Sequence, residues 1–159
     1  MEKIASFTVD HEKLLRGVYL SRLDQFGPVA VSSFDIRMKE PNREPVMDNP
    51  NIHALEHIGA TFLRNHRVWG KRIVYFGPMG CRTGYYLVVE GNLKSPDILP
   101  LVKEFFAFVI DFNGPIPGQS AIECGNFQDM NLSMAKWEAK KFYTEVLEKI
   151  TDSNLNYPL

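Results

Sequence analysis

Residues 17–38 read GVYLSRLDQFGPVAVSSFDIRM, and this stretch decides the fold. Its two halves, 17–26 and 29–38, read as two strands, and the Gly-Pro pair between them is a turn signal. Three apolar residues share one face of the second strand, whereas Ser33, Asp35 and Arg37 share the other. The stretch therefore predicts a β-hairpin with one apolar and one polar face on its second strand.

The rest of the chain predicts further strands and helices. A loop, KEPNREPVMDNP at 39–50, leads into a helix that runs to about residue 65 or 66, because Asn49 is a capping residue and Pro50 suits the first helical position. Strands follow at 72–76 and 85–90, with GPMGCRTG between them. A Ser-Pro pair begins a second helix at residue 95, which Asn-Gly-Pro ends at 113–115, and a last helix spans about 132–150.

Strand pairs followed by helices predict the α+β class, with a small, mostly antiparallel sheet packed against three to four helices. The second helix is expected to be deeply packed, because it has apolar residues at positions 98, 99, 102, 105, 106, 109 and 110. The last helix gathers apolar residues on one face at positions 135, 139, 142, 146 and 150. Without a repeat or a linker in the sequence, we expect residues 1–159 to form a single domain.

Composition limits the classes of function. The 159 residues are 45% hydrophobic and 23% charged, which is ordinary for a folded domain. The 18 Lys and Arg and the 19 Asp and Glu give a formal net charge of −1, so a nucleic acid is not expected as a partner. Two cysteines, Cys81 and Cys124, are too few for a disulfide framework or a four-cysteine zinc site.

The sequence also predicts a compartment. The N-terminal stretch MEKIASFTVDHEKLL lacks the continuous apolar core of a signal peptide. The longest apolar run, at 105–110, is far shorter than the ~20 residues of a membrane helix. We therefore expect a cytoplasmic protein with reduced thiols and no membrane partner.

Residues 53–57 read HALEH and carry the sharpest chemical signal. Each helical residue turns by ~100°, so His53, Glu56 and His57 fall on one face and the two imidazoles lie one turn apart. Two imidazoles so placed can close on one metal ion. The alternative is a pair of histidines on a solvated helix face.

A catalytic metal site usually takes three protein ligands and leaves one position for water or substrate. The candidates for the third ligand are Cys81, Cys124, His11, His66 and the acidic residues. Among the acids Glu123 stands out, since an H-x-x-E-H metallopeptidase completes its site with a distant Glu. We favour Cys124, because a thiolate is a strong soft ligand and the glycine that follows frees the backbone to approach.

Three more residues are candidates with open alternatives. Cys81 lies in a Gly-rich turn beside Arg82, where peptide N–H groups and a cation favour a thiolate, but it could equally be structural. Arg37 could bind an anionic or hydroxyl-rich substrate, or be a surface side chain paired with Asp35 or with the carboxylate at position 40. His11 could titrate and form hydrogen bonds, or only cap and face solvent.

Two other functions use the same residues. An H-x-x-E-H metallopeptidase would use Glu56 to activate water, although peptide hydrolysis has no need of the second thiol, Cys81. A non-enzymatic interaction domain would hold a structural metal in a closed shell of four ligands, whereas three ligands leave a position open.

Five motifs, in order along nearly the whole chain, resemble the S-ribosylhomocysteine lyase (LuxS) family, the autoinducer-2 production enzymes. They are SFTVDH at 6–11, FDIR at 34–37 with EPN at 40–42, HALEH at 53–57, PMGCRTG at 78–84 and CG at 124–125. Five ordered motifs at matching separations are far more specific than any one of them.

The resemblance implies a carbon–sulfur lyase that cleaves S-ribosylhomocysteine to homocysteine and 4,5-dihydroxy-2,3-pentanedione, the precursor of autoinducer-2. It implies one divalent metal per subunit, held by His53, His57 and Cys124. This metal would be Fe(II) in the native enzyme, and Zn or Co could substitute for it.

The resemblance also implies roles for the other candidates. Cys81 and Glu56 would be the acid–base pair, and Ser6, His11 and Arg37 would hold the sugar end of the substrate. The protein would work as a homodimer with active sites at the interface.

The chemistry implied is a migration of the sugar carbonyl from C1 to C3 through two enediolates, because a thioether leaves only when a carbonyl lies β to its carbon. A β-elimination then releases homocysteine. The chain departs from many family members in one place: they carry an acidic residue shortly before PMGC, where this chain reads IVYFG at 73–77. The group that binds the homocysteine amine is therefore unassigned.

Overall fold

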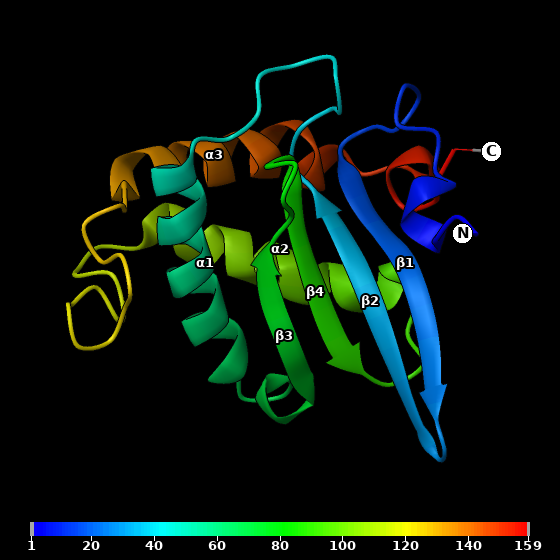
Figure 1. Ribbon diagram of the computed structural model, residues 1–159, viewed down its shortest axis with the longest axis horizontal. Helices are drawn as coiled ribbons and strands as arrows, with labels where there is room; N and C mark the ends of the chain where they lie inside the picture. The colour runs from blue at the N-terminus through cyan, green and yellow to red at the C-terminus, as the bar shows by residue number, and fades with distance from the viewer. Residues whose placement is uncertain (1, 159) are drawn as a thin grey trace.

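The computed structural model describes residues 2–158, and its centre is one four-stranded antiparallel sheet (Figure 1). The strands lie in the order β1-β2-β4-β3. Their bounds are β1 Gly17–Phe26, β2 Val29–Arg37, β3 Ile73–Pro78 and β4 Gly84–Glu90. The predicted hairpin is confirmed as β1 and β2, and the expected α+β class is confirmed, with every strand pair antiparallel.

Three α-helices within residues 2–158 pack against this sheet. Their bounds are α1 Asn49–Arg64, α2 Ser95–Asp111 and α3 Leu132–Glu145. Short 3-10 turns are η1 Ala5–Phe7, η2 Gly70–Arg72, η3 Leu147–Lys149 and η4 Asp152–Asn154. In Figure 1, α2 and α3 lie behind the sheet, α1 flanks β3, and the opposite face of the sheet is turned to the viewer.

The core fills the space between the sheet and the helices. The side chains of Phe34, Ile36 and Leu87 point into it from β2 and β4 and are at most 2% exposed. The expected packing of α2 is confirmed: positions 98, 102, 105, 106 and 109 are buried, and positions 99 and 110 are partly buried. The interior is aromatic where Phe106 meets Phe142 of α3, with ring centroids 5.0 Å apart. This packing orders the helices that carry the site.

Several element boundaries differ from the sequence predictions. Strand β3 spans Ile73–Pro78 where 72–76 was predicted, and β4 begins at Gly84 where 85 was predicted. Strand β2 ends at Arg37, because the N–H groups of Met38 and Lys39 both donate to the carbonyl of Thr83 and leave the regular ladder. Asn49 is not the cap of α1, since Asp48 precedes the first turn and its carbonyl accepts from the N–H groups of residues 51 and 52.

Helix α3 ends five residues earlier than predicted. The backbone leaves the helix at Val146 (φ −121°) and tightens into η3. Val146 stays buried and Ile150 partly buried, so the apolar face continues past the end of the α-helix. Apolar spacing alone therefore overstates the length of this helix.

A buried ion pair joins the end of β2 to α3. Lys39 Nζ lies 2.6 Å from Glu138 Oε2, and both side chains are 7% exposed. The ammonium also lies 5.5 Å from the centre of the Trp137 ring. Each charge is matched by its partner inside the protein, as buried charges require.

A search of the described residues for membrane spans finds no helix whose length and apolarity would let it cross a bilayer.

Candidate active site

His53, His57 and Cys124 form the one group of potential metal ligands found among the described residues. Their ligand atoms all lie within 4.8 Å of one another, and Cys124 Sγ lies 3.4 Å from His53 Nε2. A tetrahedral metal with ordinary bond lengths separates such a sulfur and nitrogen by about 3.5 Å. All three side chains are partly buried, so this ligand cluster remains open to a substrate.

Backbone carbonyls orient both imidazoles. His53 Nδ1 lies 3.0 Å from the carbonyl of Asp129, and His57 Nδ1 lies 2.7 Å from that of Pro117. A carbonyl only accepts, so each Nδ1 carries the proton and each Nε2 keeps its lone pair for a metal. The residues therefore fit a divalent metal, both by donor type and by the partners behind them.

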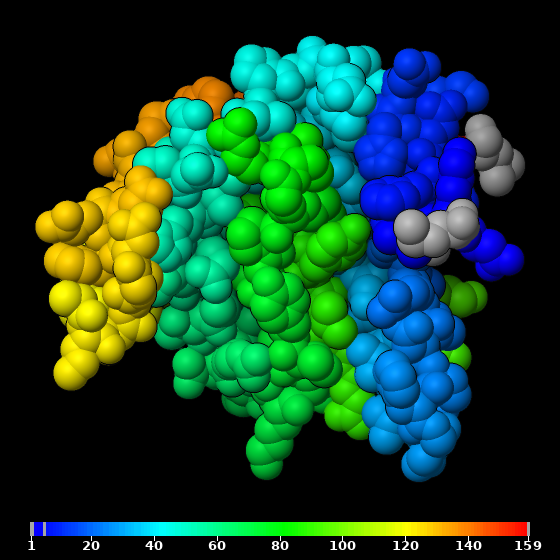
Figure 2. All heavy atoms as spheres, viewed as in Figure 1, coloured from blue at the N-terminus to red at the C-terminus, as the bar shows by residue number. Residues whose placement is uncertain are grey.

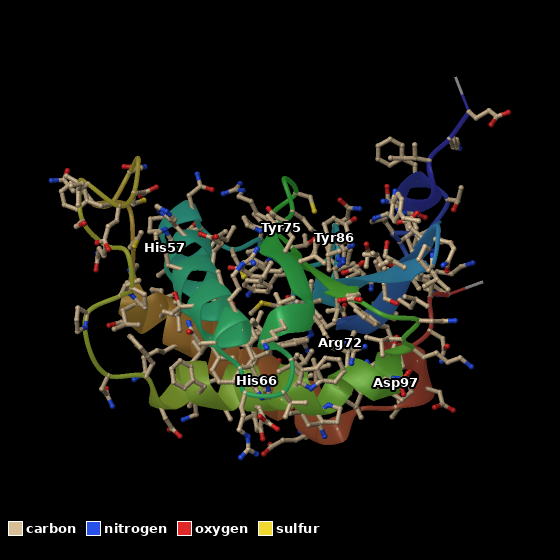
Figure 3. All side chains as sticks on the ribbon, turned by 90° about the horizontal axis from the view of Figure 1, so that it is seen from below. His57, His66, Arg72, Tyr75, Tyr86 and Asp97 are labelled. Carbon is tan, nitrogen blue, oxygen red and sulfur yellow. The ribbon has the colours of Figure 1, made fainter. Side chains whose placement is uncertain are left out.

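The loop at 113–131 is shaped around these histidines, and Figure 3 shows His57 on α1 facing it. Gly118 in this loop has φ +70°, which an L side chain rarely adopts, and a Cβ there would lie 3.1 Å from His57 Nδ1. The loop ends where the N–H of Asn131 donates to the carbonyl of Pro50. The loop thus places Cys124 beside His53 and then returns the chain to the start of α1.

The two nearby carboxylates lie differently. Glu123 is exposed and accepts a hydrogen bond from Ser120 Oγ at 2.5 Å, and it is not part of the ligand cluster. Glu56 is half-buried on α1, with Oε2 3.8 Å from His57 Nε2. Glu56 therefore lies at the edge of the cluster, beside one of its imidazoles.

Cys81 lies in a second place, in the turn between β3 and β4. It lines a cavity of about 310 Å³ together with His11, Arg37 and Thr83, and with other residues of the 41–46 segment. This Cys81 cavity contains none of the three potential metal ligands. The structure thus places Cys81, His11 and Arg37 in a cavity that the ligand cluster does not line.

Arg37 is held tightly in this cavity. Its Nε and Nη2 donate to Asp35 at 3.0 and 2.5 Å, and its Nη1 donates to Thr83 Oγ1 at 2.6 Å. Arg37 is only 4% exposed, so the alternative of a surface arginine is wrong, although its pairing with Asp35 is present. The hydroxyl of Tyr157 also donates to Asp35, at 2.9 Å, and covers the pair from the C-terminal segment.

The environment favours ionisation of Cys81. Partial burial raises the pKa of the thiol, but hydrogen bonds from Thr83 and the positive charge of Arg37 outweigh it, so the pKa is lowered overall. Arg37 stays charged, because Asp35 outweighs the effect of burial and raises its pKa. The exposed thiol is thus a candidate base.

Ser6 lies outside the Cys81 cavity. It lines a hollow of about 340 Å³ on the face of the sheet that turns away from α2. Tyr75 and Tyr86 line the same hollow and are labelled on that face in Figure 3. Figure 2 shows the N-terminal residues, in blue, beside the green of β3 and β4 on this face.

The sequence did not single out Thr83 or Tyr157. Thr83 stands two residues after Cys81 in a motif already noted, so its position was a usable signal. Tyr157 is 122 residues from Asp35 and carries no signal of its own. Its ring stacks on Tyr19 of β1 with centroids 4.8 Å apart, a contact that only the fold creates.

Comparison with known proteins gives one consistent result. A family model described as S-Ribosylhomocysteinase (LuxS) matches residues 4–153. The S-ribosylhomocysteine lyase of Desulfotalea psychrophila is 58% identical over 158 residues, which cover 99% of this chain and 99% of that protein. Proteins of the same name from Clostridium beijerinckii and Clostridium acetobutylicum are 56% and 55% identical, with the same coverage.

Proposed function

The chain belongs to the S-ribosylhomocysteinase (LuxS) family, and from this we infer how its residues cleave S-ribosylhomocysteine. It is an S-ribosylhomocysteine lyase, which yields homocysteine and 4,5-dihydroxy-2,3-pentanedione. Membership of this family replaces the two alternative functions that the H-x-x-E-H pattern allowed, a metallopeptidase and a structural metal site. The observation that carries the assignment of roles is an open cluster of three ligands in a chain that also holds a thiol of lowered pKa.

We assign the ligand cluster to one divalent metal, Fe(II) in the native enzyme with Zn or Co able to substitute. The support is the donor set of His53, His57 and Cys124, because imidazole and thiolate ligands suit these metals. When bound, the metal supplies Lewis-acid stabilisation to the negative charge that develops on the sugar oxygens.

Cys81 is the proposed carrier of protons between carbons. As a thiolate it takes the proton from C2 of the sugar and returns it to C1, which moves the carbonyl from C1 to C2. The same exchange from C3 to C2 moves the carbonyl to C3. Glu56, which serves the elimination, then takes the C4 proton, the C5–S bond breaks with its electron pair on sulfur, and homocysteine leaves as a thiolate. The enol that remains rearranges to the dione.

Glu56 is the proposed carrier of protons between oxygens. Each carbonyl shift takes a proton from the hydroxyl that becomes C=O and gives one to the carbonyl that becomes C–OH. The support is its position on α1, with Oε2 3.8 Å from His57 Nε2. A carboxylate there is near enough to the ligand cluster to serve oxygens held beside it.

Ser6, His11 and Arg37 are proposed to hold the sugar end. The support for two of them is that His11 and Arg37 line the cavity of Cys81. Three N–H groups of Arg37 donate to Asp35 and Thr83. The remaining N–H groups, on Nη1 and Nη2 of Arg37, can donate to the substrate. Arg37 thus both fixes the local charge and offers donors to hydroxyl groups.

We also propose a homodimer formed through the face of the sheet turned away from α2. Large apolar side chains are exposed there or in the N-terminal segment beside it, among them Phe7 at 69% and Tyr75 at 51%. The Cys81 cavity contains no metal ligand, so a second copy packed on this face would complete each active site. Sedimentation velocity tests the dimer, with Tyr75→Glu expected to give monomers of low activity.

The cytoplasm is the proposed site of action. Cys81 and Cys124 are both free thiols. In the proposed mechanism Cys81 carries protons and Cys124 binds the metal, and oxidation of either thiol would stop the reaction. A reducing compartment keeps both in the required state.

One assay tests the whole function. Purified protein with bound metal is incubated with S-ribosylhomocysteine, while free thiol and the trapped dicarbonyl are followed together. We expect the two products to appear in equal amounts. Cleavage of a peptide substrate without thiol release would contradict the assignment.

A further inference from the structure

Thr83 links the buried Asp35–Arg37 pair to the thiol of Cys81. Its Oγ1 lies 2.6 Å from Arg37 Nη1 and 3.1 Å from Cys81 Sγ. Arg37 Nη1 itself is 3.9 Å from that sulfur, which is a weaker contact. With the bond from Tyr157 to Asp35, these contacts form a continuous chain from the C-terminal segment to the thiol.

The chemistry of the partners fixes the direction of the bond from Arg37, and it leaves the hydroxyl proton of Thr83 available to the sulfur. A guanidinium has N–H donors and no acceptor, so the Thr83 hydroxyl must accept the bond from Arg37. A hydroxyl has a single proton, and in Thr83 this proton is left free to point at Cys81 Sγ. The sulfur is therefore offered a donor, and a donor stabilises the thiolate rather than the thiol.

We propose that Thr83 is a positioning residue that holds Cys81 as a thiolate by donating to Sγ the proton that its bond from Arg37 leaves free. The inference rests on the proposed role of Cys81 as proton carrier. The proposed mechanism assigned no role to Thr83, and this inference supplies one.

The backbone around Thr83 keeps this hydroxyl in place. Thr83 is 4% exposed, and its carbonyl accepts bonds from the N–H groups of Met38 and Lys39 at 2.9 Å each. Gly84 follows it, where a Cβ would lie 2.1 Å from the carbonyl oxygen of Ile36. The turn and β2 are thus in close backbone contact, so the fold itself sets the distance between hydroxyl and sulfur.

Other ionisable groups also face Cys81. His11, Arg37 and Glu44 line its cavity, Arg82 is its neighbour in the chain, and the hydroxyl of Tyr86 is close enough to interact with its charge. A charged Glu44 opposes the thiolate, whereas Arg37 favours it. A test must therefore separate the effect of the Thr83 hydrogen bond on Cys81 from the effect of the Arg37 charge. Removing only the Thr83 hydroxyl does this, because Arg37 keeps its charge.

The test is the pH dependence of Cys81 alkylation by iodoacetamide, read by mass spectrometry of the Cys81 peptide in the metal-loaded protein. Wild-type Cys81 should titrate below the ordinary pKa of a thiol. Thr83→Val keeps the shape and removes the hydroxyl, so the midpoint should rise. At a pH well below both midpoints, each unit of rise lowers the thiolate fraction, and with it the alkylation rate, about tenfold. Thr83→Ser keeps the hydroxyl and should restore the wild-type midpoint.

Cys124 serves as the internal control, because its alkylation should be the same in all three proteins. An unchanged midpoint in folded Thr83→Val would overturn the proposal. So would a wild-type midpoint at the ordinary value, which needs no variant and decides the matter even if Thr83→Val fails to fold. Alkylation requires no substrate, so a protein without lyase activity would contradict the proposed function and leave this result standing.

Discussion

The ligand cluster and the Cys81 cavity are built in opposite ways. The cluster takes two ligands from one turn of α1 and a third from a loop, and backbone carbonyls orient both imidazoles. The Cys81 cavity joins Arg37 of β2 to the turn after β3, with Tyr157 of the C-terminal segment behind Arg37 on Asp35, and these partners are all side chains. The difference teaches that the cluster depends on main-chain geometry, whereas the cavity depends on the identity of each side chain in its hydrogen-bond chain.

If the two regions are independent in this way, Cys81→Ala should give the largest effect. We expect turnover to fall by about 10²–10⁴-fold, because the variant loses the group that moves protons between carbons. Bound metal per chain, measured by elemental analysis, should equal that of the wild type. A loss of metal along with turnover would show that the cavity also supports the cluster.

Cys124→Ser should give the next largest effect, on the other region. Metal affinity should fall by at least about tenfold, since even the loss of a group behind a ligand costs roughly 10–100-fold. The matched control is Glu123→Gln, which should keep its affinity, because Glu123 bonds to Ser120 outside the cluster. Weaker affinity in the control, with none lost in Cys124→Ser, would make Glu123 the third ligand.

Gly118→Ala should give the smallest effect. It tests whether main-chain geometry in the loop orients the imidazole of His57. An alanine at φ +70° is strained by about 1–2 kcal/mol, and its Cβ would press on His57 Nδ1. We expect a lower melting temperature and metal affinity reduced several-fold. Gly125→Ala is the control, with no atom within 4 Å of its Cβ. Equal affinities for the two variants would show that the loop does not orient His57.

The fold was largely readable from the sequence. The hairpin, the second pair of strands and α2 depend on local patterns, and the structure contains them all. The end of α3 was missed because Val146 and Ile150 keep the same apolar face after the backbone tightens into η3. A pattern of burial reports which side faces the core, and it is insensitive to a change from one helix type to another.

The site was readable only in part, for a physical reason. Helical spacing brings His53 and His57 together, and soft-ligand chemistry pointed to Cys124, 71 residues from His53 in the sequence. The burial of Arg37 depends on Tyr157 and Asp35, which only the fold brings together. The roles drawn from family resemblance, those of Cys81, Arg37 and the metal ligands included, stay predictions.

The Lys39–Glu138 pair constrains how this sequence can change during evolution. Replacing one member alone would leave a buried charge without its partner, which costs roughly 3–5 kcal/mol. Replacing both residues with apolar residues of similar volume can leave the stability unchanged. The two positions can therefore change only together. Lineages descended from a common ancestor should therefore carry either both charges or neither, and a chain with only one of them would be a rare and short-lived intermediate.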